Sequence, residues 1–467
     1  MKRLPLALLL AGLAGCSVGP HWQRPATGLP EQWSEPTQQA RATPIDAHWW
    51  QRSADPLLTS LVQRAVANNL DVRSAANRLQ QSRALRQVSA AEQLPGLSGR
   101  SAYQRQRNSG VGLNDPSGNA GEAPYELWSA ALDASWEIDL WGHVRHAVEA
   151  ADAQVEISQA ERDGVLLSIS AETAVNYLRL RGVQAQWKVS QQNLDIARQN
   201  RDLTQTRYDN GVTTQLDTAN AAAQVATIEA RLPTLDAERE RLINALSYLL
   251  DLPPGALRSE LEATQPLPTV VADVPLGLPS QLAQRRPDIQ RSEAALRRAT
   301  AAIGAAQADF YPRVSLGASA GFQAQDGADI GAWNARQWSF GPSLYLPIFQ
   351  GGRLSGTLQL REQQQQAAAL DYRKTVLGAW HEVANAASDY AAEQRHYAAL
   401  SEAVRQNELA LRSARERYSQ GATDFINVLN VQRALLETQS AQVNSATQAG
   451  LDRIQLYRAL GGGWPKG

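Results

Sequence analysis

Apolar and polar residues follow two different periods along this chain of 467 residues. Long stretches place an apolar residue every three or four positions, which indicates amphipathic helices, whereas four shorter stretches alternate apolar and polar residues one by one, which indicates strands. The predicted helices span residues 57–93, 142–207, 212–250, 279–310, 352–417 and 422–460, and the predicted strands lie within 97–107, 127–141, 314–324 and 338–348. The pattern therefore predicts a mainly helical chain with a small β part.

The helical pattern occurs twice. A motif built on Arg207, Tyr208, Gly211 and Thr213 returns as Arg417, Tyr418, Gly421 and Thr423, a shift of 210 residues (417 − 207). Its glycine takes the left-handed conformation that ends a helix. Thr214 with Asp217, and Asp424 in the second copy, have the spacing of caps for the next helix. Each copy is therefore predicted to be a tight turn between two long helices.

The four alternating stretches have the features of strands that cross a lipid bilayer. They are about ten residues or longer, with one apolar face that carries aromatic residues near its ends and one polar face. The alternative is a half-buried strand in a soluble sheet, but no further strand is predicted that would cover the apolar face. Four strands cannot close a barrel, and an open edge is costly in lipid. We therefore expect identical copies to pool their strands, in a number that this argument leaves open.

The N-terminal residues are typical of an exported protein. Lys2 and Arg3 precede an apolar run over 4–13, which is a secretory signal and too short to anchor in a membrane. The end of this run, Leu13-Ala14-Gly15-Cys16, resembles a bacterial lipobox, so the mature chain would start at a lipidated Cys16. The alternative is an ordinary signal peptide followed by a stray thiol. Ser17 beside the cysteine resembles lipoproteins that are sorted to the outer membrane.

These patterns give an expected domain organisation. The expected parts are a signal peptide over 1–15, a lipidated arm over 16–56, a first repeat over 57–252, a linker over 253–279 and a second repeat over 280–467. The first repeat would hold a helix, a strand hairpin at about 96–141 and a long helical hairpin with its tip near 208–214. The second would hold a helix, a strand hairpin at about 313–349 and a helical hairpin with its tip near 418–424.

Composition narrows the possible functions. The formal net charge is −1 and no long block of one sign occurs, so nucleic acid is not an expected partner. The only cysteine is Cys16, which excludes a disulfide framework and cysteine-rich metal sites. Gly317-Ala318-Ser319-Ala320-Gly321 fits a hydrolase pattern, but that pattern needs a strand-to-helix turn and here lies inside a predicted strand. His143 and His146 are expected to be solvated. We therefore predict no enzyme, no cofactor and no metal.

Several short motifs occur in a fixed order along the chain. They are Cys16-Ser17-Val18-Gly19-Pro20, Trp50 with Asp55-Pro56-Leu57, the two Arg-Tyr-x-x-Gly turns, Leu346-Pro347-Ile348-Phe349 before Gly351-Gly352-Arg353, and the terminal Leu460-Gly461-Gly462-Gly463-Trp464. As a set they resemble the outer membrane factors of Gram-negative tripartite efflux pumps, the OprM/NodT/TolC-like family, in its lipoprotein branch. The resemblance covers nearly the whole chain.

The resemblance implies a homotrimer in which a 12-strand β-barrel in the outer membrane stands on a 12-helix periplasmic α-barrel, with a mixed equatorial region. The implied partners are a periplasmic adaptor protein, an inner-membrane transporter, commonly of the resistance-nodulation-division class, and outer membrane lipid. The two turns would dock the adaptor at the closed periplasmic end. Residues after the second turn would line the aperture: Ile426, Asn427 and Asn430. Many relatives carry aspartate at the position of Asn430, so a polar constriction is expected here rather than a ring of anions.

Two other functions fit the same patterns. An exit duct of a type I protein secretion system would share the same body, and its genomic neighbours would include an ABC exporter. A periplasmic structural lipoprotein without a pore would conduct no ions.

Overall fold

The computed structural model describes residues 17–26, 48–109, 123–267 and 282–462. The predicted signal peptide, Cys16, residues 27–47 of the predicted arm and residues 268–279 of the predicted linker lie outside these residues. The chain divides into two compact units. The first unit holds residues 1–25, 78–158 and 291–372, and the second holds 26–77, 159–290 and 373–467.

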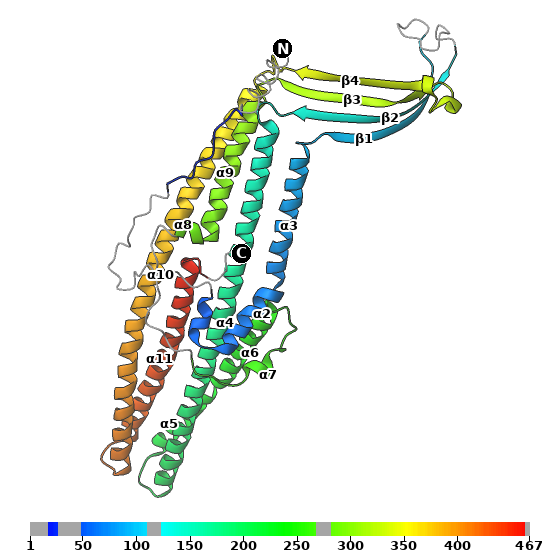
Figure 1. Cartoon of the computed structure of the whole chain (residues 1–467). Coiled ribbons are helices and arrows are strands. Elements are labelled where there is room, and N and C mark those ends of the chain that lie inside the picture. Colours follow the sequence, from blue (N-terminus) through cyan, green and yellow to red (C-terminus); the bar gives the residue numbers. More distant parts are fainter. Residues whose placement is uncertain (1–16, 27–47, 110–122, 268–281, 463–467) are drawn as a thin grey trace. The chain divides into compact units, whose positions relative to one another are not determined.

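The first unit contains a four-stranded antiparallel sheet. Its strands are β1 (Gly96–Gln106), β2 (Tyr125–Ile138), β3 (Arg313–Ala324) and β4 (Arg336–Tyr345), and they lie side by side in that order (Figure 1). The short 3-10 helices η4 (Gly327–Asp329) and η5 (Trp333–Ala335) connect β3 to β4. The strands occupy the four stretches in which apolar and polar residues alternate.

The register of the sheet gathers the apolar residues on one face. Residues directly opposite each other in an antiparallel pair point to the same face. Leu132 lies opposite Ala320, and Ala320 lies opposite Trp338. The same face carries Leu97, Tyr103, Trp128, Ala134, Trp136, Ile138, Val314, Leu316, Ala318, Phe322, Phe340 and Leu344. The opposite face is mainly polar, and on it Arg100 forms an ion pair with Asp133 at 3.4 Å.

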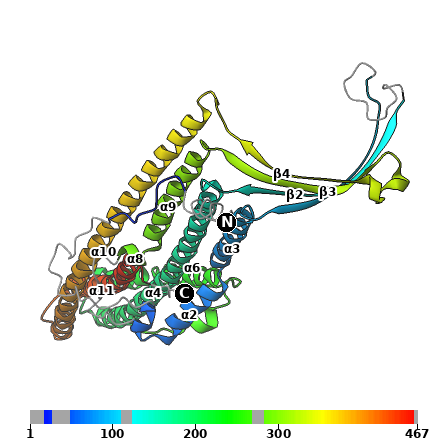
Figure 2. The ribbon, with the colours of Figure 1, turned by 45° about the horizontal axis from the view of Figure 1, so that its top comes forward.

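Each strand is joined to a helix at one common end of the sheet (Figure 2). Helices α3 (Leu70–Ala91) and α9 (Pro287–Ala308) precede β1 and β3, and α4 (His143–Asp209) and α10 (Arg353–Ser419) follow β2 and β4. The helices α4 and α10 have 67 residues each, which corresponds to roughly 100 Å at 1.5 Å per residue. No helix among the described residues is both long enough and apolar enough to cross a membrane.

The expectation of a solvated histidine pair is wrong for His146. Its side chain is only 4% exposed, because the arm at Val18 and the backbone of Gly304 cover it. The ring nitrogens lie 2.8 Å from a Glu149 carboxylate oxygen and 2.9 Å from the Val18 carbonyl oxygen. The imidazole therefore anchors the arm. His143 is partly exposed and lies 3.1 Å from a carboxylate oxygen of Asp309.

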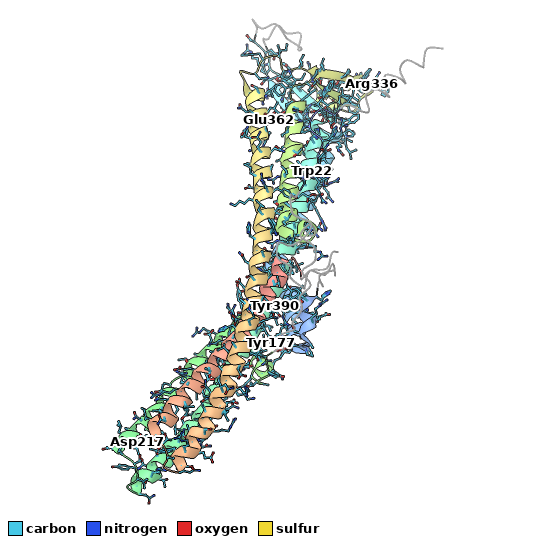
Figure 3. The ribbon with its side chains drawn as sticks, turned by 90° about the vertical axis from the view of Figure 1, so that its left-hand side faces the viewer. Trp22, Tyr177, Asp217, Arg336, Glu362 and Tyr390 are labelled. Carbon is cyan, nitrogen blue, oxygen red and sulfur yellow. The ribbon has the colours of Figure 1, made fainter. Side chains whose placement is uncertain are left out.

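The second unit is helical. Besides parts of α3, α4, α9 and α10 it holds η2 (Trp49–Ser53), α2 (Pro56–Asn68), α5 (Gln215–Glu229), α6 (Leu232–Leu249), α7 (Arg258–Leu261), α8 (Leu282–Arg285) and α11 (Phe425–Ala459). In this unit α4 turns back into α5, and α10 turns back into α11, so that two helical hairpins result (Figure 1). Asp217, labelled in Figure 3, lies at the end where both hairpins turn.

Three helices that were predicted as continuous are divided. The predicted helix 57–93 breaks at Asn69, whose side-chain oxygen accepts from the amides of Asp71 and Val72 and so starts α3. The predicted helix 279–310 breaks at Arg286, before Pro287, which suits a first helical position. The predicted helix 212–250 breaks after Glu229, because Pro233 has no amide hydrogen to donate to its carbonyl.

Candidate functional site at the tips of the helical hairpins

Both predicted turns have the same backbone geometry. The amide of Gly211 donates to Tyr208 O and that of Val212 to Arg207 O, each at 2.8 Å. In the second copy the amide of Gly421 donates to Tyr418 O at 3.0 Å and that of Ala422 to Arg417 O at 2.8 Å. These bond pairs end a helix in a Schellman motif, which needs a left-handed residue. Gly211 and Gly421 meet this need with φ values of 70° and 73°.

The two turns differ in how the next helix begins. The Thr214 hydroxyl accepts from the amide of Asp217, and an Asp217 carboxylate oxygen accepts from the amide of Thr214, so the predicted capping box is present at α5. The Thr213 hydroxyl also donates to this carboxylate at 2.6 Å. Partial burial acts to raise the pKa of Asp217, but hydrogen bonds from Thr213 and Thr214 outweigh it and lower the pKa. Asp424 occupies the N-cap position of α11, but the expected side-chain cap is absent.

A contact between Arg207 and Tyr418 ties the two hairpins together. The Arg207 guanidinium lies 4.7 Å from the centre of the Tyr418 ring and donates to the Tyr418 carbonyl oxygen at 3.0 Å. Tyr418 packs against Phe425, with 5.5 Å between ring centroids. It is 4% exposed and belongs to an apolar cluster with Val404, Leu411, Val428, Leu429, Leu435 and Ala221. Arg207 of the first turn thus covers Tyr418 of the second turn.

The equivalent residues of the two copies have opposite environments. Tyr208 is 42% exposed, whereas Tyr418 is buried. Arg417 is exposed, whereas Arg207 is half-buried. The exposed side of the first turn is also apolar, with Val212 at 61% and Leu216 at 69% exposure. The first tip therefore presents an apolar surface, and the second tip contributes the core that holds the hairpins together.

The three aperture candidates lie on one exposed side of α11. Ile426, Asn427 and Asn430 are exposed, while Phe425, Val428 and Leu429 face the apolar cluster. The Asn427 amide donates to the Thr423 hydroxyl at 2.9 Å, which fixes that side chain at the start of the helix. Asn430 is one turn further along the same side. One apolar and two uncharged polar side chains thus face outward on the first turns of α11.

The sequence did not predict a row of paired side-chain amides between α4 and α11, here called the amide seam. Asn200 donates to Gln432 at 2.7 Å, Asn193 donates to Gln439 at 2.8 Å, and Gln186 donates to Asn444 at 2.9 Å. Asn193, Asn200 and Gln432 are at most 3% exposed. Gln186, Asn193, Asn200 and Arg207 are spaced by seven residues, as are Gln432 and Gln439. This spacing is typical of a coiled-coil contact and is the signal that could have revealed the seam.

Neither chemical motif of the sequence forms a reactive site. Residues 317–321 lie inside the continuous strand β3. A side chain at Gly321 would overlap with the carbonyl of Ala130 on the neighbouring strand, so this glycine allows strands to approach. In the described part of the chain no group of three or more histidine, cysteine, aspartate or glutamate residues could hold a metal ion.

Comparison with known proteins identifies the family. A family model described as outer membrane efflux protein matches residues 61–250 and again 278–462, ranges that overlap the two predicted repeats. The chain belongs to the outer membrane efflux protein family. The resemblance to the outer membrane factors is thereby confirmed.

Members of the outer membrane efflux protein family are similar over almost the full length. The toluene efflux pump outer membrane protein TtgC of Pseudomonas putida is 32% identical over 99% of this chain and 95% of its own length. The solved outer-membrane channel OprN is 33% identical, with a TM-score of 0.90 over 96% of this chain and all of that one. The open state of the MtrE channel of Neisseria gonorrhoeae is 28% identical, with a TM-score of 0.85 over 97% of this chain and 99% of that one. The predicted fold class is confirmed.

Proposed function

We propose that this protein is the outer membrane channel of a tripartite efflux pump, a passive duct through which small toxic molecules leave the cell. The observation that carries the proposal is the sheet, in which all four strands place most of their apolar residues on one face. Its edge strands β1 and β4 each pair on one side only within the described residues. In lipid, these edges must pair with further strands. The family and the name of the toluene efflux relative support the same function.

The assembly that fits these edges is a homotrimer. Three copies would supply 12 strands to one barrel and their helical hairpins to a periplasmic α-barrel. The apolar face would contact outer membrane lipid, and the polar face with Arg100 and Asp133 would line the lumen. A lipidated Cys16 would add an anchor at the periplasmic side. The duct would perform no catalysis, because an inner-membrane transporter supplies the energy.

The first tip would bind the adaptor, and the residues after the second tip would form the gate. The exposed apolar surface of Tyr208, Val212 and Leu216 suits an amphipathic helix of a periplasmic adaptor. Ile426, Asn427 and Asn430 would form the polar constriction. The contact of Arg207 with Tyr418 would hold the constriction shut until adaptor binding outweighs it.

Complementation of a deletion strain tests this function. The strain should become sensitive to several drugs, dyes or solvents, and the wild-type chain should restore resistance. Tyr418→Ala and Asn430→Ala should change the resting conductance in planar bilayers or the level of drug export. If both variants matched the wild type in both measurements, the gate would be wrongly assigned. Loss of secretion of a protein substrate, without drug sensitivity, would favour a type I secretion duct instead.

A further inference from the structure

The two repeats contain an equivalent junction, where the end of one helix meets the break before another. In the second unit, α6 ends with Asp251 N–H bonded to Tyr248 O and Leu252 N–H bonded to Ser247 O. The end of α11 repeats both bonds 210 residues later, from Gly461 and Gly462. The helix breaks at Asn69 and Arg286 correspond as well, with a shift of 217 (286 − 69). The two junctions can therefore be compared position by position.

In the second repeat, an arginine fills the junction. Arg286 donates to both carboxylate oxygens of Asp288 at 3.0 and 2.7 Å, to Glu382 at 2.7 Å and to the Ala459 carbonyl at 2.6 Å. Burial acts to lower the pKa of Arg286, but its bonds to the two carboxylates outweigh burial and raise the pKa. A Cβ at Gly461 would lie 3.1 Å from the backbone of Arg285, so the break packs directly on the end of α11.

In the first repeat, the arginine is replaced by Asn69. Its side-chain amide donates to the Leu249 carbonyl at 3.0 Å, as Arg286 donates to Ala459. An amide is too short to reach further, and its oxygen already caps α3. Asp71, the equivalent of Asp288, thus lacks the guanidinium that Asp288 binds.

A cavity borders Asn69 and Asp71, which are the first-repeat equivalents of Arg286 and Asp288. It measures about 220 Å³ and is lined by Asn69, Leu70, Asp71, Tyr248, Asp251, Leu252 and Pro253. The lining holds two carboxylates and no cationic residue. Tyr248 is 77% exposed, so its ring is available for stacking. Planar guanidinium groups bind carboxylates through two parallel hydrogen bonds and also stack on aromatic rings, which an ammonium group does less well.

We propose that this cavity, the first-repeat junction, binds an arginine side chain presented by a partner polypeptide. Asp71 would take the guanidinium as Asp288 takes Arg286, Asp251 would add a second negative charge, and the Tyr248 ring would cover the group. The two carboxylates of the cavity favour a cationic ligand. The arginine at the equivalent junction of the second repeat, Arg286, indicates that the cation is a guanidinium. The proposal concerns a docking point on the second unit and does not depend on whether the sheet forms a pore.

The test uses purified full-length protein in detergent and ligand-observed saturation-transfer NMR. The probe is N-acetyl-arginine amide, and N-acetyl-citrulline amide, which has the same shape without the charge, is the comparison. We expect the arginine probe to bind and the citrulline probe to give no signal. Asp71→Asn should weaken arginine binding roughly tenfold, because a charge-assisted pair is lost. Asp195→Asn, an exposed aspartate on α4, is the matched control and should bind like the wild type.

A second variant blocks the cavity without removing a carboxylate. Asn69→Arg places the second-repeat arginine in the first repeat, so it should abolish probe binding while Asp71 and Asp251 remain. The proposal would be overturned if the wild type bound both probes equally or neither, or if Asp71→Asn and Asp195→Asn behaved alike. Because none of these readouts involves conductance or drug export, their failure is separate from a failure of the proposed channel function.

Discussion

Arg207 and Arg417 occupy the same position of a repeated motif and have different roles. Arg207 stacks on Tyr418 and binds its carbonyl, whereas Arg417 remains exposed to solvent. The side chain of Tyr418 is buried without a hydrogen-bond partner for its hydroxyl within the described part of the chain. Arg207 therefore stabilises the contact between the two hairpins mainly through the ring face and the backbone carbonyl of Tyr418.

Replacing Arg207 with alanine removes one charge-assisted hydrogen bond and one cation–π contact, together about 2 kcal/mol. We expect Arg207→Ala to raise the resting conductance in planar bilayers. Arg417→Ala deletes the same charge from an exposed position and should leave the conductance near the wild-type value. Equal increases in the two variants would show that charge, rather than this contact, controls the resting state.

The cap at Asp217 gives the first tip a pH dependence. The pKa of Asp217 in the folded protein lies below the ordinary value of 3.8. Its stabilisation is therefore complete above that ordinary value and disappears as the pH falls through the lowered folded-state pKa. Asp217→Ala should cost about 1 kcal/mol of local stability at neutral pH.

Hydrogen exchange of the first-turn amides of α5 measures this loss. The matched variant is Asp424→Ala, which removes an N-cap aspartate whose side chain forms no capping hydrogen bond. It should change exchange at α11 much less. If Asp424→Ala were as destabilising as Asp217→Ala, the cap assignment would be incorrect.

At the scale of elements, both contacts of α11 contain polar pairs. The α10–α11 contact combines an apolar cluster near the tip, with residues such as Leu411, Tyr418 and Val428, with side-chain hydrogen bonds further along, such as that from Asn407 to Thr438 at 3.1 Å. The α4–α11 contact contains the amide seam of Asn193, Asn200, Gln432 and Gln439. Buried amides contribute little net stability but penalise arrangements that leave them unpaired, so they fix one register between two helices.

A double-mutant cycle tests the amide seam. Asn200→Leu should cost about 1–3 kcal/mol, because it leaves the side-chain oxygen of the buried Gln432 without its donor. Adding Gln432→Leu should recover part of this loss, since two apolar side chains then pack together. Thermal unfolding of the four proteins measures the coupling, and exposed Gln205→Leu on α4 serves as the control. Additive losses would contradict a direct buried pair.

The elements show what the sequence could predict. The turns at Gly211 and Gly421 could be predicted, because the left-handed conformation of a glycine at a helix end depends only on neighbouring residues in the sequence. The strands could be predicted from the strict alternation of apolar and polar residues, because this pattern does not depend on how many subunits form the sheet. The break at Asn69 was missed because Asn-Leu-Asp is compatible with a helix, and the cap depends on a buried contact with Leu249. The difference in exposure between Tyr208 and Tyr418 could not be predicted either, because their local sequences match and only tertiary packing buries one of them.

At the scale of the whole molecule, the proposed function depends on the sheet of the first unit and on the hairpin tips of the second unit. The sheet of the first unit has an apolar face and two edges without partners in the described residues, and the second unit carries hairpin tips whose exposed surfaces suit an adaptor and a gate. Such a chain is stable in a membrane only when several copies close the sheet. The transport function and the assembly therefore depend on the same four strands.

The conductance of the purified protein in a planar lipid bilayer tests this dependence most directly. Protein extracted in detergent as an oligomer should insert and produce discrete, long-lived current steps, small at rest and larger for Arg207→Ala. A water-soluble single subunit that inserts nowhere and carries no current would contradict the account.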